Sequence, residues 1–293
     1  MRTGRMSINI SIASQPHRPE IHGHRGCRGL RPENTLSAFL HAAALGVDVV
    51  ELDVVISQDQ QVVVSHEPWL SAKLGRDALG QLIDPAQEQR YNLYQLPYAT
   101  IQGCALGEWP HPDFPAQQPV LSYRPLLRDV VQKVTAASQH LGRSIGFSVE
   151  LKSSPEGDTI FHPKPAQFVD LVVAELQATD VVGRTTLLSF DPRILQVARQ
   201  CYPDFALCLL VEASLPPIAK LFDSLGFEPE ALGPDFHLLS TVVVQSMRAA
   251  YPRLRLGPWT VNSPEELATV LEWRTDSITT DYPDRLASLL DKG

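Results

Sequence analysis

The sequence lacks the features that mark several large classes of protein. No apolar run approaches the roughly 18 residues of a membrane-spanning helix, so we expect no transmembrane segment. No run of five like charges occurs, and the net charge is −8 at pH 7. Since nucleic-acid phosphates attract a basic surface, this charge argues against a nucleic-acid partner. A small-molecule anionic substrate stays open, because a local cluster of arginine or lysine is enough to hold one.

Common catalytic motifs are missing too. The chain has no Walker A sequence, no H-E-x-x-H zinc motif and no G-x-S-x-G nucleophile turn. The Gly-rich G-x-G-x-x-G turn of dinucleotide-binding folds is also absent. Any catalytic chemistry must therefore come from a different set of residues.

Cysteine is scarce and carries no metal-binding pattern. The four cysteines form no C-x-x-C pair and show no zinc-ligand spacing. We expect free thiols in a reducing compartment, while the even count leaves a secreted, disulfide-bearing form open. A chain of 293 residues buries enough surface to fold without a disulfide or a metal.

The N-terminal segment, residues 1–19, carries Arg2 and Arg5 ahead of a short apolar run that Asn9 and Ser11 interrupt. This run is too short and too broken for the apolar part of a signal peptide. We therefore expect a flexible leader or an edge strand. We expect a cytoplasmic protein, with a periplasmic or secreted one as the alternative; the oligomeric state cannot be read from the sequence.

Short β-branched runs alternate with helical periods along the rest of the chain. The expected strands cover residues 20–24, 47–55, 61–66, 144–151, 185–190, 205–211, 236–240, 253–261 and 276–280. The expected helices cover residues 34–45, 124–141, 165–178, 191–201, 215–225, 243–251, 264–273 and 286–290. About eight strand–helix units of this kind predict an α/β fold, the (β/α)8 TIM barrel. An open doubly wound sheet is the runner-up.

Residues 67–122 depart from this alternation. They contain many prolines and glycines, and few apolar residues at helical spacing. Long loops of this kind in compact domains are usually functional. We expect a single domain over residues 20–293, in which this segment is a small insertion after the second barrel strand.

Two carboxylates follow each other on one face of an expected strand. Side chains alternate along a strand, so Glu51 and Asp53 point the same way while Leu52 points to the other face. Two carboxylates side by side in an apolar barrel repel each other and need a cation or a shared proton. A hard divalent ion such as Mg²⁺ or Ca²⁺ satisfies them most simply; the alternative is a salt-bridged pair with a nearby Arg or Lys.

A second charged pair repeats this geometry at the end of the strand over residues 144–151. Glu150 and Lys152 flank a leucine and share one face. Glu150 offers a third carboxylate to the metal, and Lys152 can face a phosphate oxygen. The alternative is a simple ion pair between Glu150 and Lys152.

Other strand ends supply further candidates, because the working residues of such barrels lie at the C-terminal ends of the strands. His24 and His66 each end an expected strand. Arg25 suits a phosphate or a carboxylate. The aromatic residues Phe190 and Trp259 can wall a pocket, or can simply pack at the rim.

These residues belong to a series of spaced motifs in a fixed order. The motifs are His24-Arg25-Gly26, Pro32-Glu33-Asn34-Thr35, Ala38-Phe39, Gly46-Val47-Asp48, Glu51-Leu52-Asp53-Val54, Val63-Val64-Ser65-His66, Glu150-Leu151-Lys152, Ser189-Phe190-Asp191 and Trp259-Thr260-Val261-Asn262. Over roughly residues 20–290 the series resembles the glycerophosphodiester phosphodiesterase family. Two departures are Glu67, where the family usually has Asp, and Pro125-Leu126-Leu127, where it has Pro-Thr-Leu.

The resemblance implies a role for each candidate residue. His24 and His66 would be the general acid–base pair, and Glu51, Asp53 and Glu150 would hold one divalent metal ion. Arg25, and with it Lys152, would hold the phosphate, with Phe190 and Trp259 beside the substrate. Residues 67–122 would be the family's small cap next to the active site.

The implied reaction is metal-dependent hydrolysis of a glycerophosphodiester. One histidine would take a proton from the nucleophile and the other would protonate the leaving alcohol. The products would be sn-glycerol 3-phosphate and an alcohol such as choline or ethanolamine. The alternatives are a lysophospholipase D-like or phosphoinositide-type phosphodiesterase on the same barrel, and a binding protein without catalysis. In the lysophospholipid case an apolar ridge on the insertion, including Ile83, Leu93 and Ile101, would admit the acyl chain.

Overall fold

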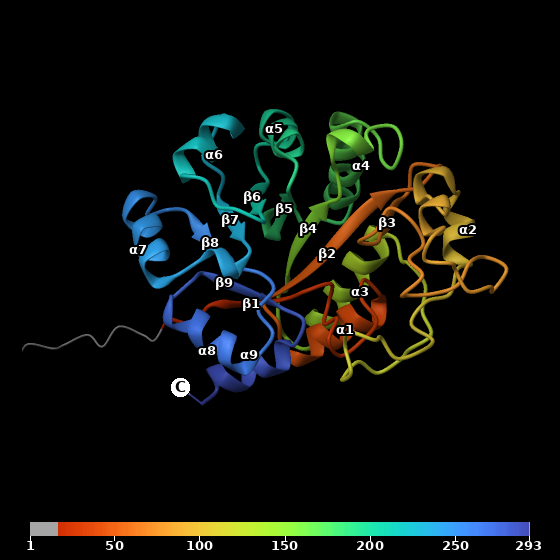
Figure 1. The fold of residues 1–293 in the computed structure, drawn as a ribbon, viewed down its shortest axis with the longest axis horizontal. Coiled ribbons are helices and arrows are strands. Elements are labelled where there is room, and N and C mark those ends of the chain that lie inside the picture. Colours follow the sequence, from red (N-terminus) through yellow and green to blue (C-terminus); the bar gives the residue numbers. More distant parts are fainter. Residues whose placement is uncertain (1–16, 293) are drawn as a thin grey trace, which may run out of the picture.

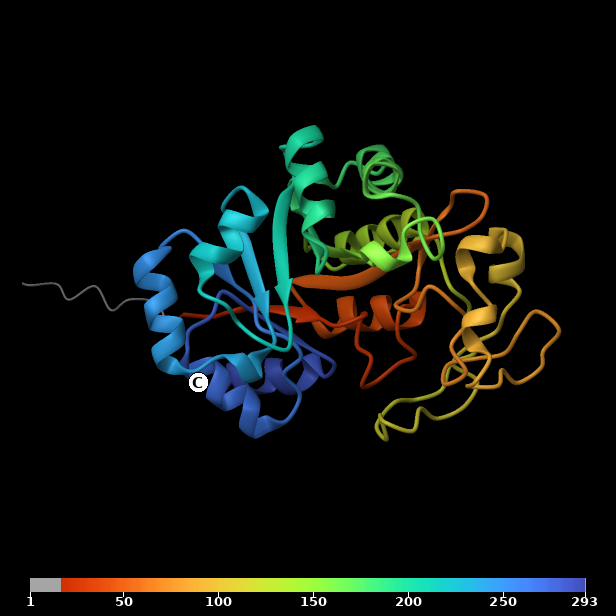
Figure 2. The same ribbon diagram turned by 45° about the horizontal axis from the view of Figure 1, so that its top comes forward.

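The computed structural model describes residues 17–292. Figures 1 and 2 show a ring of strands surrounded by helices, with an irregular orange-to-yellow segment at one side. The leader expected over residues 1–19 lies mostly outside the described residues. None of the helices described is long and apolar enough to cross a membrane.

Within residues 17–292, eight parallel strands form the ring. The strands are β1 (Glu20–Gly23), β2 (Val49–Ile56), β4 (Gly146–Leu151), β5 (Thr185–Ser189), β6 (Ala206–Val211), β7 (Ala231–Pro234), β8 (Arg255–Leu256) and β9 (Ser277–Thr280). They pair in the order β8-β7-β6-β5-β4-β2-β1-β9. Backbone hydrogen bonds from Val261 N to Thr279 O and from Thr279 N to Pro258 O, each 3.0 Å, join the two ends. The predicted (β/α)8 TIM barrel is confirmed.

Helices cover the outside of this ring (Figure 1). They are α1 (Leu36–Leu45), α3 (Leu127–His140), α4 (Pro165–Ala178), α5 (Pro192–Cys201), α6 (Ile218–Leu225), α7 (Thr241–Ala250), α8 (Pro264–Glu272) and α9 (Pro283–Leu290). Their ends follow local capping rules. Thr35 caps the start of α1 by accepting a hydrogen bond from Ala38 N, and Gly46 ends it with a φ of 90°.

The alternation of side chains along the strands separates the core from the barrel interior. Leu52 of β2 and Val149 of β4 are fully buried against the helices. Their neighbours Glu51, Asp53 and Glu150 face the interior of the ring instead. The burial of the outward row therefore determines which way the carboxylates point.

Two predicted strands are wrong in position or extent. The strand expected over residues 236–240 is instead β7 (Ala231–Pro234), and residues 236–238 form a short 3-10 helix. β7 contains a glycine and a proline and no β-branched residue, so local propensity does not reveal it. The strand expected over residues 253–261 shrinks to β8 (Arg255–Leu256). Gly257 N still donates to Leu232 O of β7 at 3.0 Å, but Pro258 has no N–H with which to continue the ladder.

The insertion begins after β3 (Val62–Val64), which runs antiparallel to β2. It contains one short α-helix, α2 (Tyr98–Gln102), and two 3-10 helices, Glu88–Arg90 and Leu93–Gln95. It has a hydrophobic core of its own. Ile83, Leu93 and Ile101 are buried there against Val55 and Val63. These three residues were candidates for an apolar ridge that would admit an acyl chain. Because their side chains are buried in the core of the insertion, they do not form an exposed ridge.

Candidate active site

The candidate residues meet at the C-terminal ends of the barrel strands. His24 follows β1, Glu51 and Asp53 lie in β2, and Glu150 lies in β4. His66 stands two residues after β3. Parallel strands present their carboxyl ends on one side of a barrel, which is why residues far apart in sequence gather here.

Three carboxylates form the centre of this cluster. One oxygen from each of Glu51, Asp53 and Glu150 lies within 4.8 Å of the others, and all three residues are buried. Burial, together with the charges of Asp53 and Glu150, raises the pKa of Glu51 well above its usual range. Burial also raises the pKa of Glu150, although Lys152 offsets part of the effect. Crowded buried carboxylates of this kind need positive charge to ionise together.

Lysine and arginine supply part of that charge. Lys152 Nζ donates a hydrogen bond of 2.6 Å to Glu150 Oε1 and lies 3.6 Å from Asp53 Oδ1. Arg25 Nε lies 3.3 Å from Asp53 Oδ2. Burial opposes the ionisation of Asp53, but Arg25, His66 and Lys152 outweigh it, so the pKa of Asp53 falls below its usual range.

The ion pair between Glu150 and Lys152 was the alternative interpretation of the charged pair at the end of β4, and the structure contains it. Glu150 remains within the carboxylate cluster while it pairs with Lys152. The ion pair is therefore compatible with Glu150 as a third candidate metal ligand. Arg25 likewise donates to Glu33 Oε1 at 2.8 Å, which means that its guanidinium already holds carboxylates.

The turn after β1 orients the first histidine and the first carboxylate together. Arg25 has a φ of 47°, and its backbone N–H donates to Glu51 Oε2 at 2.8 Å. His24 Nε2 lies 4.0 Å from the same oxygen of Glu51. The imidazole of His24 therefore lies directly beside the carboxylate cluster.

His24 is held from its other side by an aspartate. His24 Nδ1 lies 2.7 Å from Asp281 Oδ1, directly after β9. Arg28 donates two hydrogen bonds to Asp281, of 2.9 and 3.1 Å, and Asn262 Nδ2 donates one of 2.8 Å. Burial lowers the pKa of His24 to about 4 against the opposing effect of Asp281. The imidazole is thus neutral near neutral pH and fixed in orientation.

His66 approaches from the side of the insertion. Its Nδ1 lies 2.8 Å from Oε1 of Glu67, the residue that departs from the family pattern. Ser65 Oγ donates to the backbone oxygen of Glu67 at 2.8 Å and accepts from Arg124 Nε at 3.2 Å. The buried Arg124, which follows the insertion, thereby holds the segment that carries His66 in place.

A cavity of about 830 Å³ contains both histidines, Glu51, Glu150 and Lys152. It extends down the inside of the barrel as far as Glu20 and Arg255 at the opposite strand ends. The rings of Phe190 and Trp259 meet edge to face, with their centroids 5.5 Å apart, and line the same cavity. Every site residue predicted from the sequence lines this cavity except Asp53, whose carboxylate lies beside those of Glu51 and Glu150.

Several functional neighbours were not predicted. The sequence alone assigns no role to Asp281, Asn34, Glu33 or Arg28. Asn34 Nδ2 donates to Asp53 Oδ2 at 2.8 Å, and Arg28 lies 3.7 Å from Glu33. The only local signal is the Pro-Glu-Asn-Thr motif, because the contacts themselves join distant segments.

The chemistry of the carboxylate cluster fits a divalent cation. Three buried carboxylates with converging oxygens are the ligands that Mg²⁺ and Ca²⁺ prefer. The raised pKa of Glu51 points to the same kind of ligand. Part of that rise comes from repulsion by Asp53 and Glu150, and a bound cation would relieve this repulsion. The residues thus indicate a divalent metal site, while the choice of ion stays open.

Several known proteins are similar to this chain over most of its length. A glycerophosphodiester phosphodiesterase of Bacillus altitudinis is 26% identical over 276 residues, which is 93% of this chain and 98% of that protein. A candidate glycerophosphoryl diester phosphodiesterase from Silicibacter pomeroyi DSS-3 superposes with a TM-score of 0.83 at 28% identity, over 95% of both chains.

An Oleispira antarctica phosphodiesterase, solved with its product sn-glycerol-3-phosphate, shares the fold with a TM-score of 0.73 at 20% identity, over 93% of this chain and 97% of that one. The family profile described as "Glycerophosphoryl diester phosphodiesterase family" matches residues 24–285. This match runs from His24 into the first turn of α9 and covers most of the chain, so the chain is an enzyme that belongs to the glycerophosphoryl diester phosphodiesterase family.

Proposed function

We propose that this chain hydrolyses glycerophosphodiesters to sn-glycerol 3-phosphate and an alcohol, with His24 and His66 as the general acid–base pair. The observation that supports this most directly is that one cavity contains both histidines beside the carboxylate cluster. Membership of the family supports the same reaction.

The two histidines would divide the proton transfers. Neutral imidazole at His24, oriented by Asp281, is suited to take a proton, and an imidazole hydrogen-bonded to Glu67 is suited to hold one. General acid–base catalysis by positioned side chains is worth about 10²- to 10⁴-fold in rate. The nucleophile, water or a substrate hydroxyl, is not assigned.

Glu51, Asp53 and Glu150 would hold one divalent ion, Mg²⁺ or Ca²⁺. When bound, the ion would supply electrostatic stabilisation of the charge that grows on the phosphoryl oxygens. Lys152, at the edge of the cluster, would hold a phosphate oxygen, and Arg25 would maintain the position of Asp53 and contribute to the same positive field. Phe190 and Trp259 would wall the substrate and exclude water.

The test measures release of sn-glycerol 3-phosphate from glycerophosphocholine. Wild type and His24→Ala would be assayed with Mg²⁺, with Ca²⁺ and with excess chelator. We expect turnover that requires a divalent ion and that falls at least ~10²-fold in the variant. Absence of turnover with either ion would overturn this substrate assignment and direct attention to lysophospholipids.

A further inference from the structure

A second cavity, of about 370 Å³, adjoins the barrel cavity on the side of the insertion. The two cavities share His66, Glu150, Lys152 and Phe190. A molecule that passed from one cavity into the other would therefore pass the catalytic histidine. The second cavity has no role in the function proposed above.

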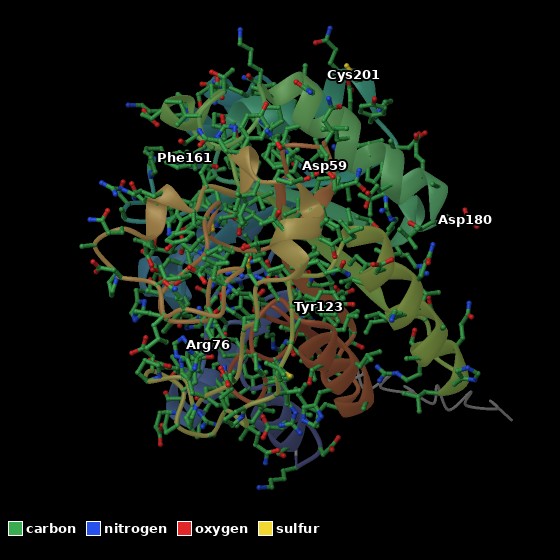
Figure 3. The ribbon with its side chains drawn as sticks, turned by 90° about the vertical axis from the view of Figure 1, so that its right-hand side faces the viewer. Asp59, Arg76, Tyr123, Phe161, Asp180 and Cys201 are labelled. Atoms are coloured by element: carbon green, nitrogen blue, oxygen red, sulfur yellow. The ribbon has the colours of Figure 1, made fainter. Side chains whose placement is uncertain are left out.

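Aromatic rings form much of the wall of this second cavity. Trp69 begins the insertion, and Phe161 lies in the loop between β4 and α4. Their rings meet edge to face with centroids 5.5 Å apart. Asn92 of the insertion donates to the backbone oxygen of Ile160 at 2.7 Å and so fixes the loop beside Trp69. Figure 3 looks onto the insertion and labels Phe161 on this face.

The charges in the second cavity are mostly negative. Its charged side chains, histidines aside, are three carboxylates, Glu67, Glu150 and Glu156, and one ammonium, Lys152. Lys152 is held at the inner end by its 2.6 Å hydrogen bond to Glu150. Glu156 is exposed and makes no ion pair with any residue from 17 to 292. The outer part of the cavity thus combines aromatic faces with an unneutralised carboxylate.

We infer that this cavity receives the leaving alcohol and selects alcohols that carry an ammonium group. Aromatic faces attract quaternary ammonium through their quadrupoles, and Glu156 adds a complementary charge. The phosphoryl group would lie near His66, and the alcohol would extend towards Trp69 and Phe161. This inference rests on the proposed function, because the leaving group exists only if the chain cleaves a phosphodiester.

The first experiment compares kcat/KM for glycerophosphocholine with kcat/KM for glycerophosphoglycerol, whose alcohol has no charge. It uses wild type, Phe161→Leu and Glu156→Gln, with Glu228→Gln as an exposed control outside the cavity. We expect wild type to prefer the choline ester. Each cavity variant should reduce that preference about fivefold to tenfold, and Glu228→Gln should leave it unchanged.

The second experiment measures binding by calorimetry and does not depend on turnover. Choline and 3,3-dimethylbutan-1-ol have the same shape, but only choline is charged. We expect choline to bind wild type more tightly than the neutral alcohol, and Glu156→Gln to reduce the difference, because the aromatic rings of Trp69 and Phe161 remain.

Equal binding of the two alcohols by wild type, or an unchanged substrate preference in both cavity variants, would overturn the ammonium site. If neither ester were hydrolysed while selective choline binding persisted, only the proposed function would fail. The two outcomes are therefore distinguishable.

Discussion

Nδ1 of His24 lies 2.7 Å from Oδ1 of Asp281, although 257 positions separate the two residues in the chain. The contact exists because β1 and β9 are neighbours in the barrel. Asp281 is itself held by Arg28 and Asn262, so the imidazole is oriented by a group that cannot easily move.

Replacing Asp281 by Asn should reduce turnover because the imidazole loses its negatively charged partner. The amide keeps the shape of the side chain but does not stabilise a protonated His24. We expect kcat to fall about tenfold to a hundredfold, with little change in the affinity for a divalent ion. Steady-state kinetics combined with metal titration would check this; a variant with wild-type kcat would contradict it.

The same carboxylate should make stability depend on pH in the acid range. Burial opposes the ionisation of Asp281, but His24 and Arg28 outweigh it and hold its pKa below its usual range. A carboxyl group with a depressed pKa in the folded state stabilises the fold above its unfolded pKa, about 3.9, and loses this contribution as the pH falls further. Urea unfolding measured from pH 7 to pH 3 should therefore show that wild type has a larger free energy of unfolding than Asp281→Asn, and that this difference shrinks below about pH 4. If the difference in free energy of unfolding stayed constant over this pH range, the prediction would be wrong.

Divalent ions should stabilise the folded chain through the carboxylate cluster. A ligand at a hundredfold excess over its dissociation constant contributes about 2.7 kcal/mol, or roughly 4–5 °C in Tm for a chain of 293 residues. We expect this rise for wild type with Mg²⁺ or Ca²⁺, its reversal by chelator, and its loss in Glu150→Gln. The exposed control Glu228→Gln should behave as wild type, and an undiminished rise in Glu150→Gln would argue for binding elsewhere.

Lys152 Nζ donates a hydrogen bond to Glu150 Oε1, so Lys152 would compete with a divalent ion that used this oxygen as a ligand. Lys152→Met should therefore lower kcat/KM at least about tenfold through loss of a phosphate contact, without weakening metal binding. The metal dissociation constant, measured by titration, should stay the same or fall. Weaker metal binding in the variant would show that Lys152 supports the metal site and does not compete with it.

The turn that carries His24 and Arg25 depends on a glycine. Gly26 has a φ of +86°, and a Cβ atom there would lie 2.7 Å from the backbone carbon of Ala38. Gly26→Ala should lower the free energy of unfolding by about 2 kcal/mol or more. The matched control is Gly183→Ala, where no heavy atom lies within 4 Å; we expect a change within about 0.5 kcal/mol. Urea midpoints would separate the two, and equal effects would contradict the argument.

The fold was predictable because its strands and helices carry strong local signals. α4 begins and ends where the periodicity of residues 165–178 places it, and Gly46 ends α1 as expected. β7 was missed because Ala-Leu-Gly-Pro has little strand propensity. Its pairing with β6 and β8 is a property of the closed barrel.

For the candidate site too, some features were predictable from the sequence and others were not. Strand alternation alone places Glu51 and Asp53 on one face, and Glu150 repeats that pattern, because the two-residue period is a property of the backbone. The ion pair between Glu150 and Lys152 was one of two readings of that pattern, and only the structure shows that it forms. The hydrogen bond from Asn34 to Asp53 was not predictable, because Asn34 has no distinguishing local pattern.

By itself the sequence determined the barrel, the family, and the two histidines and three carboxylates that we propose for the site, because each depends on local periodicity or on motifs within a few residues. Only the tertiary structure decided that Asp281 orients His24, that Lys152 bonds to Glu150, and that the insertion and the loop after β4 enclose a second, aromatic cavity. Those features depend on distances between segments far apart in the chain, and such distances are set by closure of the barrel and by packing of the insertion against it.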